Sequence, residues 1–150
     1  MNRIDQKTPT SIDDDYALWA AEQAALVRAR RVDRLDVENV AEELDGLGRS
    51  EEHQIDSRLE VLLTHLLKWQ FQPGKRKPGW KASIDEQRVR LARILRKSPS
   101  LRSYPAESLR GSFIIGRNQA VSETGLDETV FPETCPYTVE EVFDPDYFPD

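Results

Sequence analysis

The sequence predicts an all-α fold, a single-domain up-and-down helical bundle of about five helices. Apolar residues recur at helical spacing along most of its 150 residues, whereas valine and isoleucine are sparse and alternating runs of apolar and polar residues are absent. Hydrophobic residues make up 38 % of the chain, which is enough for one core. A chain of this length needs neither a disulfide nor a metal ion to stabilise it.

The first helix is expected from about Asp13 to Ala29. Acidic residues at its beginning and arginines at its end match the two poles of the helix dipole. At 100° per residue, one stripe of this helix is expected to face the core, formed by Tyr16, Trp19, Ala20, Gln23 and Val27.

A second, shorter helix is expected from Asp36, which is a good N-cap, to about Asp45. Gly46 is expected to end this helix, and Gly48 follows as a further break. The side chains expected to face inward are Val37, Val40, Ala41 and Leu44.

The third helix, from Ser50 to about Gln70, carries the clearest pattern. Its wide apolar stripe extends over four turns and consists of Ile55, Leu59, Leu62, Leu63, Leu66 and Trp69. Each fully buried leucine stabilises a fold by about 1.5–3 kcal/mol, so this stripe must be covered. We expect this helix to form the centre of the core.

Prolines and glycines in residues 71–79 predict a loop before a fourth helix, which ends near Lys97. This helix is expected to begin between Trp80 and the capping box formed by Ser83 and Glu86. Its inward face is expected to consist of Ile84, Arg88, Leu91 and Leu95, flanked by Gln87 and Ile94.

A fifth helix is expected from about Ala106 to Thr124, with Gly125 as its stop. Its inward stripe is thin and contains small residues, which indicates close approach to a neighbouring helix; it consists of Ala106, Leu109, Phe113, Gly116 and Ala120. Ile114 and Ile115 lie at the sides of this stripe, so a homo-oligomer, in which a second subunit covers them, is one expectation.

Residues 1–150 are expected to form one domain, with residues 1–11 flexible and residues 126–150 as a C-terminal tail. The tail is rich in proline, acidic and aromatic residues, too many of them aromatic for a disordered segment. Thr138 and Glu141 have capping-box spacing and predict a short helix. We expect the tail to wrap the bundle.

Several short strings follow one another along the chain: Trp19-Ala-Ala-Glu-Gln23, Leu35-Asp-Val-Glu-Asn39, Ala41-Glu-Glu, Leu47-Gly-Arg-Ser-Glu51, His65-Leu-Leu-Lys-Trp-Gln70, Glu86-Gln-Arg88, Ser98-Pro-Ser-Leu101, Glu123-Thr-Gly125, Phe131-Pro and Cys135-Pro-Tyr-Thr138. In this order they resemble the bacterial family catalogued as domain of unknown function 29. The resemblance implies an all-α up-and-down bundle in a bacterial intracellular protein, and it implies no activity.

Charge is segregated along the chain. Residues 72–117 hold 12 basic and 3 acidic side chains, whereas the segments on either side are acidic and the whole chain has a net charge of −6. The basic stretch 75–97, with Trp80 inside it, could bind a nucleic acid by neutralising phosphates and stacking on bases. We favour the alternative that it folds against the acidic ends, because nucleic-acid-binding domains are usually basic overall.

Polar residues beside or on the apolar stripes suggest a cluster inside the bundle. They are Glu22, Gln23, Glu43, Arg58, His65, Gln87 and Arg88. If these faces converge, His65 beside Glu22 or Glu43 could transfer protons, as in a small enzyme. The alternative, which we favour, is a buried network of hydrogen bonds and ion pairs that fixes how the helices pack.

No metal site, cofactor or catalytic nucleophile is expected. His53 and His65 are twelve residues apart and about 18 Å along one helix, too far to share an ion. The single cysteine, Cys135, excludes a disulfide framework. The chain contains no apolar run long enough to span a membrane and no secretory signal, so a cytoplasmic protein is expected.

The favoured function is therefore a helical interaction or regulatory module with a protein partner and without catalytic chemistry. Two alternatives stay open: nucleic-acid binding through residues 75–97, and a small enzyme with a site formed by His65 and a carboxylate.

Overall fold

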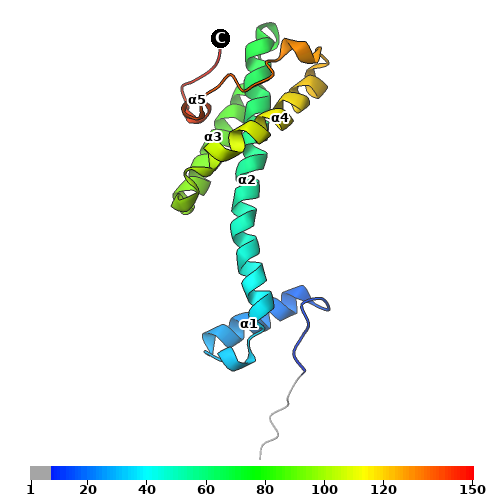
Figure 1. Cartoon of the computed structure of the whole chain (residues 1–150), viewed down its shortest axis with the longest axis vertical. Coiled ribbons are helices and arrows are strands. Elements are labelled where there is room, and N and C mark those ends of the chain that lie inside the picture. The colour runs from blue at the N-terminus through cyan, green and yellow to red at the C-terminus, as the bar shows by residue number, and fades with distance from the viewer. Residues whose placement is uncertain (1–7) are drawn as a thin grey trace, which may run out of the picture. The chain divides into compact units, whose positions relative to one another are not determined.

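The computed structural model describes residues 8–150, which form helices joined by loops, the longest of them between Thr124 and Val139 (Figure 1). Within this range the α-helices are α1 (Tyr16–Arg28), α2 (Val37–Phe71), α3 (Pro78–Lys97), α4 (Tyr104–Thr124) and α5 (Val139–Phe143), and no strand occurs. The prediction of an all-α fold is confirmed. No helix among these residues combines the length and the apolar character that crossing a membrane would need.

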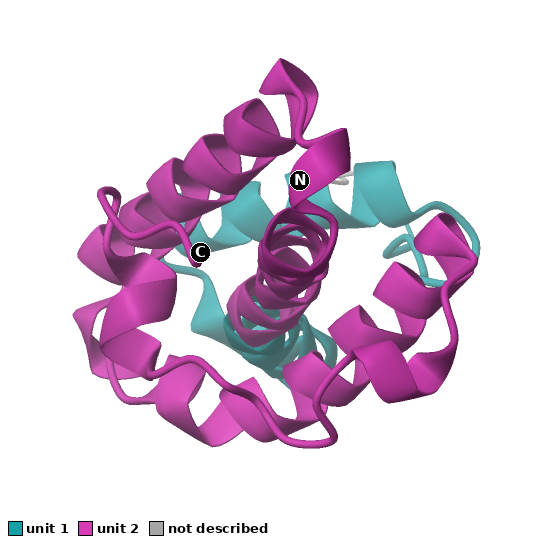
Figure 2. Cartoon of the chain, turned by 90° about the horizontal axis from the view of Figure 1, so that it is seen from above, with its two compact units in different colours: residues 1–49 teal, residues 50–150 magenta. Residues whose placement is uncertain are grey.

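The chain divides into two compact units, residues 1–49 (unit 1) and residues 50–150 (unit 2), which Figure 2 shows in different colours. Helix α2 contributes to both units. Residues 1–11 were expected to be flexible, and residues 1–7 of this segment lie outside the described residues. Within the rest of that segment, the backbone N–H and the hydroxyl of Thr10 donate to the Glu22 carboxylate at 3.2 Å and 2.9 Å.

Unit 1 is organised around Trp19. Helix α1 begins where Asp15 caps it, its carboxylate accepting from the Leu18 N–H at 2.9 Å. One turn later, Trp19 is only 3 % exposed and its indole N–H donates to Asp36 at 3.0 Å. The backbone N–H of Asp36 donates in turn to the Gln23 side chain at 2.8 Å. These bonds fix the start of α2 against α1.

The predicted inward face of α1 is half right. Trp19 and Gln23 are buried, as predicted. Tyr16 and Val27 are each 56 % exposed, so their predicted burial is wrong. Helical spacing placed them on one stripe, but that stripe is covered only in its middle, where it meets the beginning of α2.

The expected second and third helices are one helix. Gly46 and Gly48 lie inside α2, and the predicted stop at Gly46 is wrong. Each glycine costs a helix about 1 kcal/mol relative to alanine, but neither glycine removes a backbone hydrogen bond. Helix propagation is cooperative, so helical segments on both sides of the two glycines carry the helix through them. In unit 1, Val37 and Leu44 are 52 % and 63 % exposed, so their predicted burial is also wrong.

The second half of α2 forms the centre of the unit 2 core, as predicted. Its side chains with no exposed surface are Ile55, Leu59, Leu62, Leu63, Leu66 and Leu67. Ile84 and Leu91 of α3 and Phe113 of α4 join them in one apolar cluster. Helix α3 begins at Pro78, earlier than predicted, because a proline at the first helical position needs no hydrogen-bond partner for its nitrogen.

Helix α4 crosses α2 closely at Gly116, as the small residues in its stripe predicted. A Cβ at Gly116 would lie 3.0 Å from the carbonyl oxygen of Glu60 and 3.2 Å from Cβ of Leu63. The Thr64 hydroxyl lies 3.2 Å from the carbonyl oxygen of Gly116 and donates to that of Glu60 at 2.7 Å. Helix α4 ends at Gly125, whose φ of 68° is left-handed, as predicted.

The C-terminal segment contributes to the same core. Phe131, Tyr137 and Val142 are at most 4 % exposed and belong to its apolar cluster. The predicted capping box is present: Thr138 and Glu141 exchange hydrogen bonds at the start of α5. Residues 126–150 therefore supply apolar side chains that cover unit 2.

Candidate functional site

The predicted polar residues of unit 1 are engaged in separate hydrogen bonds. Glu22 accepts both hydrogen bonds from Thr10. Glu43 accepts from the Tyr16 hydroxyl at 2.5 Å, and this hydrogen bond raises the pKa of Tyr16. Gln23 holds the first residues of α2, as described above. The contacts of Glu43 and Gln23 join α1 to α2, whereas that of Glu22 joins α1 to the segment before it.

The structure brings two of the predicted residues in unit 2 together. Arg58 donates to the side-chain oxygen of Gln87 at 3.2 Å and thereby links α2 to α3. Arg88 and His65 bind other groups: Arg88 the C-terminal segment, and His65 its own helix.

Arg88 holds the C-terminal segment by its backbone. It is 4 % exposed, and it donates to the carbonyl oxygens of Val142 at 2.8 Å, Glu141 at 3.2 Å and Tyr147 at 2.8 Å. The Phe148 ring lies 5.3 Å from its guanidinium carbon. Burial lowers the pKa of Arg88, but a guanidinium remains charged. The position of Arg88 on an apolar stripe suggested a functional site, but in the structure its guanidinium binds the backbone of the C-terminal segment.

His65 lies at the edge of a shallow hollow. The hollow has a volume of about 210 Å³ and is lined by Glu60, Val61, Thr64, His65, Ile115, Gln119 and Glu123. Nδ1 of His65 lies 2.8 Å from the carbonyl oxygen of Val61, so in the neutral ring Nδ1 carries the proton and Nε2 is the acceptor.

No carboxylate among the described residues is hydrogen-bonded to His65. Glu60 and Glu123 are the carboxylates that line the hollow, and Glu123 accepts from Lys68 at 2.7 Å and from Gln119 at 3.0 Å. These two bonds lower the pKa of Glu123, with Gln119 contributing most. A carboxylate held by two donors is a weak base, so Glu123 is not the activated partner that proton transfer by His65 would need.

Sequence reasoning missed the pairing of Lys68 with Glu123. Lys68 is 9 % exposed, and its ammonium lies 4.8 Å above the Trp80 ring. The available signal was the position of Lys68, which directly follows two core leucines in α2. The partners lie 12 and 55 residues further along the chain and could not be assigned from spacing.

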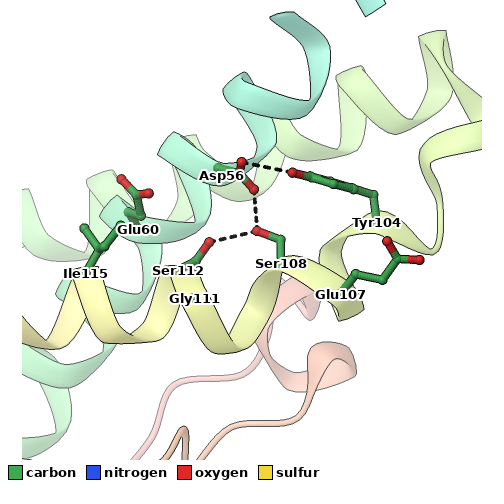
Figure 3. Close-up of a pocket in the computed structure, with 8 residues that line it drawn as sticks. All are labelled: Asp56, Glu60, Tyr104, Glu107, Ser108, Gly111, Ser112 and Ile115. Atoms are coloured by element: carbon green, nitrogen blue, oxygen red, sulfur yellow. Dashed lines mark hydrogen bonds between the residues drawn. The ribbon is translucent and has the colours of Figure 1, made fainter. Parts of the chain in front are cut away.

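A second hollow lies between α2 and α4 and contains a chain of hydrogen bonds (Figure 3). Its volume is about 350 Å³, and its lining residues are Asp56, Glu60, Tyr104, Glu107, Ser108, Gly111, Ser112 and Ile115. Asp56 accepts from the Tyr104 hydroxyl at 3.0 Å and from the Ser108 hydroxyl. The Ser112 hydroxyl lies 2.9 Å from that of Ser108 and is left to donate to it. Sequence reasoning did not single out the four hydrogen-bonded residues, Asp56, Tyr104, Ser108 and Ser112.

The hydrogen bonds around Asp56 connect two helices and hold none of these side chains in a catalytic arrangement. Burial and the bond to Asp56 raise the pKa of Tyr104 to about 12, so its hydroxyl remains a donor at neutral pH. Burial, and secondly the charge of Asp56, raises the pKa of Glu60. Ser108 faces a carboxylate with no histidine between them, so it has no base that would activate it as a nucleophile. These hydrogen bonds link α2 to α4 beside their close crossing at Gly116.

Three basic side chains of the stretch 75–97 form ion pairs within the protein. These pairs are Lys81 with Asp85, Arg90 with Glu86 and Lys97 with Glu51. Trp80, proposed above as a stacking platform, is only 7 % exposed and has its ring beside Lys68. Base stacking needs an exposed ring face, so the arrangement of Trp80 does not favour nucleic-acid binding.

Cys135 lies half-buried in the C-terminal segment, where burial raises the pKa of its thiol. A raised pKa disfavours the reactive thiolate form. In residues 8–150, no three His, Cys, Asp or Glu side chains converge as the ligands of a metal ion would.

Unit 1 presents an uncovered apolar surface on α2. We call it the α2 face, and it consists of Val37, Val40, Ala41, Leu44, Leu47 and Gly48. Val37 is 52 % exposed, Leu44 63 % and Leu47 65 %. Single exposed apolar residues are common on protein surfaces, but several on one helical face are typical of a binding surface. Sequence analysis assigned four of these residues to the core.

Two comparisons with known proteins, one with curated proteins and one with solved structures, give no match for this chain. A comparison with protein families does give one. Residues 12–148 match the family described as Domain of unknown function DUF29, which is nearly the whole chain. This match covers both units, and the chain therefore belongs to the DUF29 family.

Proposed function

We propose that this protein is a helical interaction module without catalytic chemistry, and that the α2 face of unit 1 is its contact surface for a protein partner. The observation that carries the proposal is the exposure of Val37, Leu44 and Leu47 on one face of one helix. Burying such side chains releases about 25 cal/mol per Å² of apolar surface, which favours association.

The spacing of the face supports a helical contact. Val37, Val40, Leu44 and Leu47 follow one another at intervals of three, four and three residues. This is the spacing by which helices pack along a common seam, and amphipathic helices in grooves use similar anchors.

The polar residues of the chain support the absence of catalysis. Arg88 clamps the C-terminal segment, Asp56 ties two helices together, and Glu123 is held by two donors. Each group is committed to holding the fold rather than left available to a substrate.

The test is affinity capture with the full chain from cells that naturally express it. The variant Leu44→Gln/Leu47→Gln removes the two most exposed leucines of the face and keeps a residue that favours helix. The matched control is Val89→Gln/Ile114→Gln, which removes side chains that are 52 % and 54 % exposed elsewhere. We expect one defined protein to be retained by the parent and the control and lost from the face variant. Equal retention by all three would contradict the proposal.

A further inference from the structure

Acidic side chains lie along both edges of the α2 face, and the basic side chain of Arg49 directly follows its last residue. At 100° per residue the face covers about 120° of the helix, from Leu47 at one edge to Ala41 at the other. Glu43 follows about 40° beyond the first edge and Asp45 about 40° beyond the second. Residues 36–48 contain five acidic side chains and no basic one.

Most of these carboxylates face solvent. Glu38, Glu42 and Asp45 are exposed. Asp36 accepts from Trp19 and Asn39, and Glu43 accepts from Tyr16. Neutral donors leave the negative charge in place, so the apolar face has an anionic margin on both sides.

From this arrangement we infer that the α2 face binds a cationic amphipathic helix of a partner protein, one with leucine or valine along one side and lysine or arginine beside them. The inference rests on the proposed function and names the partner's chemistry. Apolar side chains supply contact area, while charges of opposite sign at the margin select the partner and speed its approach.

The same margin argues against other occupants. An identical α2 face of a second copy would bring like charges together, which is destabilising. The phosphates of a nucleic acid would be repelled as well. The basic segment 72–117 of a second copy is the competing cationic occupant, and the experiment below distinguishes it.

The experiment measures binding of two designed helical peptides of about 18 residues, long enough to be helical. One carries leucine on one side and lysine elsewhere, and the other replaces each lysine with glutamate. Fluorescence anisotropy with the full chain should show tighter binding of the lysine peptide, by at least about tenfold, and the preference should shrink as salt is raised. Equal binding of the two peptides would overturn the inference.

Two sets of variants separate the α2 face from the general acidity of the chain. Leu44→Gln/Leu47→Gln should weaken binding of the lysine peptide by about tenfold or more. Glu38→Gln/Asp45→Asn should weaken it by about threefold at low salt. Glu133→Gln/Asp146→Asn changes net charge by the same amount in the C-terminal segment and should leave binding unchanged. An equal effect of the two charge variants would overturn the inference.

Two further outcomes are decisive. Analytical ultracentrifugation that shows a dimer abolished by Leu44→Gln/Leu47→Gln would identify a second copy as the occupant and overturn the inference. If a protein is captured from cells through the α2 face but the lysine peptide binds no better than the glutamate peptide, the inference is overturned. The proposed function would then still stand. If the face variant changes neither capture nor peptide binding, both proposals are wrong.

Discussion

The close crossing of α2 and α4 at Gly116 can be tested by adding one methyl group. The methyl group of a Gly116→Ala variant would lie 3.0 Å from the carbonyl oxygen of Glu60 and 3.3 Å from the backbone nitrogen of Thr64. Both are backbone atoms of α2, so the clash is relieved only if the two helices separate. Overpacking of this kind costs about 1–3 kcal/mol.

Gly111 provides a matched control in the same helix. A Cβ there meets no atom within 4 Å, and the position is exposed. Replacing glycine by alanine inside a helix stabilises it by about 1 kcal/mol at either site. Both variants gain the same helix propensity, so the difference between their free energies of unfolding measures the clash at Gly116 alone.

We expect Gly111→Ala to raise the free energy of unfolding by about 1 kcal/mol relative to the parent. The free energy of unfolding of Gly116→Ala should be lower than that of Gly111→Ala by about 1–3 kcal/mol. Both glycines lie in unit 2, so urea unfolding followed by far-ultraviolet circular dichroism measures both values in the transition of unit 2, provided that the slope with denaturant stays constant. If Gly116→Ala stabilises the protein as much as Gly111→Ala, α2 and α4 do not approach as closely as described and the reasoning is refuted.

Three further predictions concern other parts of the chain. Gly46→Ala/Gly48→Ala should stabilise α2 by about 1–2 kcal/mol in urea unfolding, because both glycines lie inside the helix and alanine fits at each. Arg88→Met should cost about 2–4 kcal/mol and expose residues 126–150 to limited proteolysis, because the hydrogen bonds of a buried arginine to three carbonyl oxygens are lost. Glu123→Gln should reduce the loss of stability on acidification. Because the pKa of Glu123 is lowered from 4.5 in the folded protein, its charged form stabilises the fold above pH 4.5, and this stabilisation is lost as the pH falls further.

Each of these predictions has an outcome that contradicts it. Destabilisation by the alanines would mean that α2 bends or breaks near residue 46. Unchanged proteolysis of Arg88→Met would mean that apolar contacts alone hold the tail. A Glu123→Gln variant with the parent's acid profile, compared with Glu133→Gln as an exposed control, would mean that Lys68 and Gln119 contribute no stability through Glu123.

The sequence predicted the elements that repeat a strong local pattern. The leucine stripe of α2, the stop at Gly125 and the capping box at Thr138 were all recognisable because each depends on residues within a few positions of one another. The error at Gly46 has a physical cause. A glycine can end a helix or be carried inside it, and the difference depends on the helical segments on both sides rather than on the glycine.

The candidate sites were less predictable because their partners come from distant segments. Arg88 was recognised as a polar residue on an apolar stripe, but its partners are backbone carbonyls 53–59 residues away, which carry no sequence signal. The exposure of Leu44 could not be predicted for a related reason. Helical periodicity shows which residues share a face, but not whether another element covers that face.

The placement of the tryptophans gives each unit its own fluorescent reporter. Trp19 is buried in unit 1, whereas Trp69 and Trp80 belong to unit 2. In unit 1 the side chains buried among the described residues are Trp19 and Gln23, while unit 2 encloses a continuous leucine-rich interior. Local opening costs least where the fewest apolar groups are enclosed, so emission from Trp19 should change at a lower denaturant concentration than emission from Trp80. The chain would then lose its order in two steps, with the segment that carries the α2 face opening first.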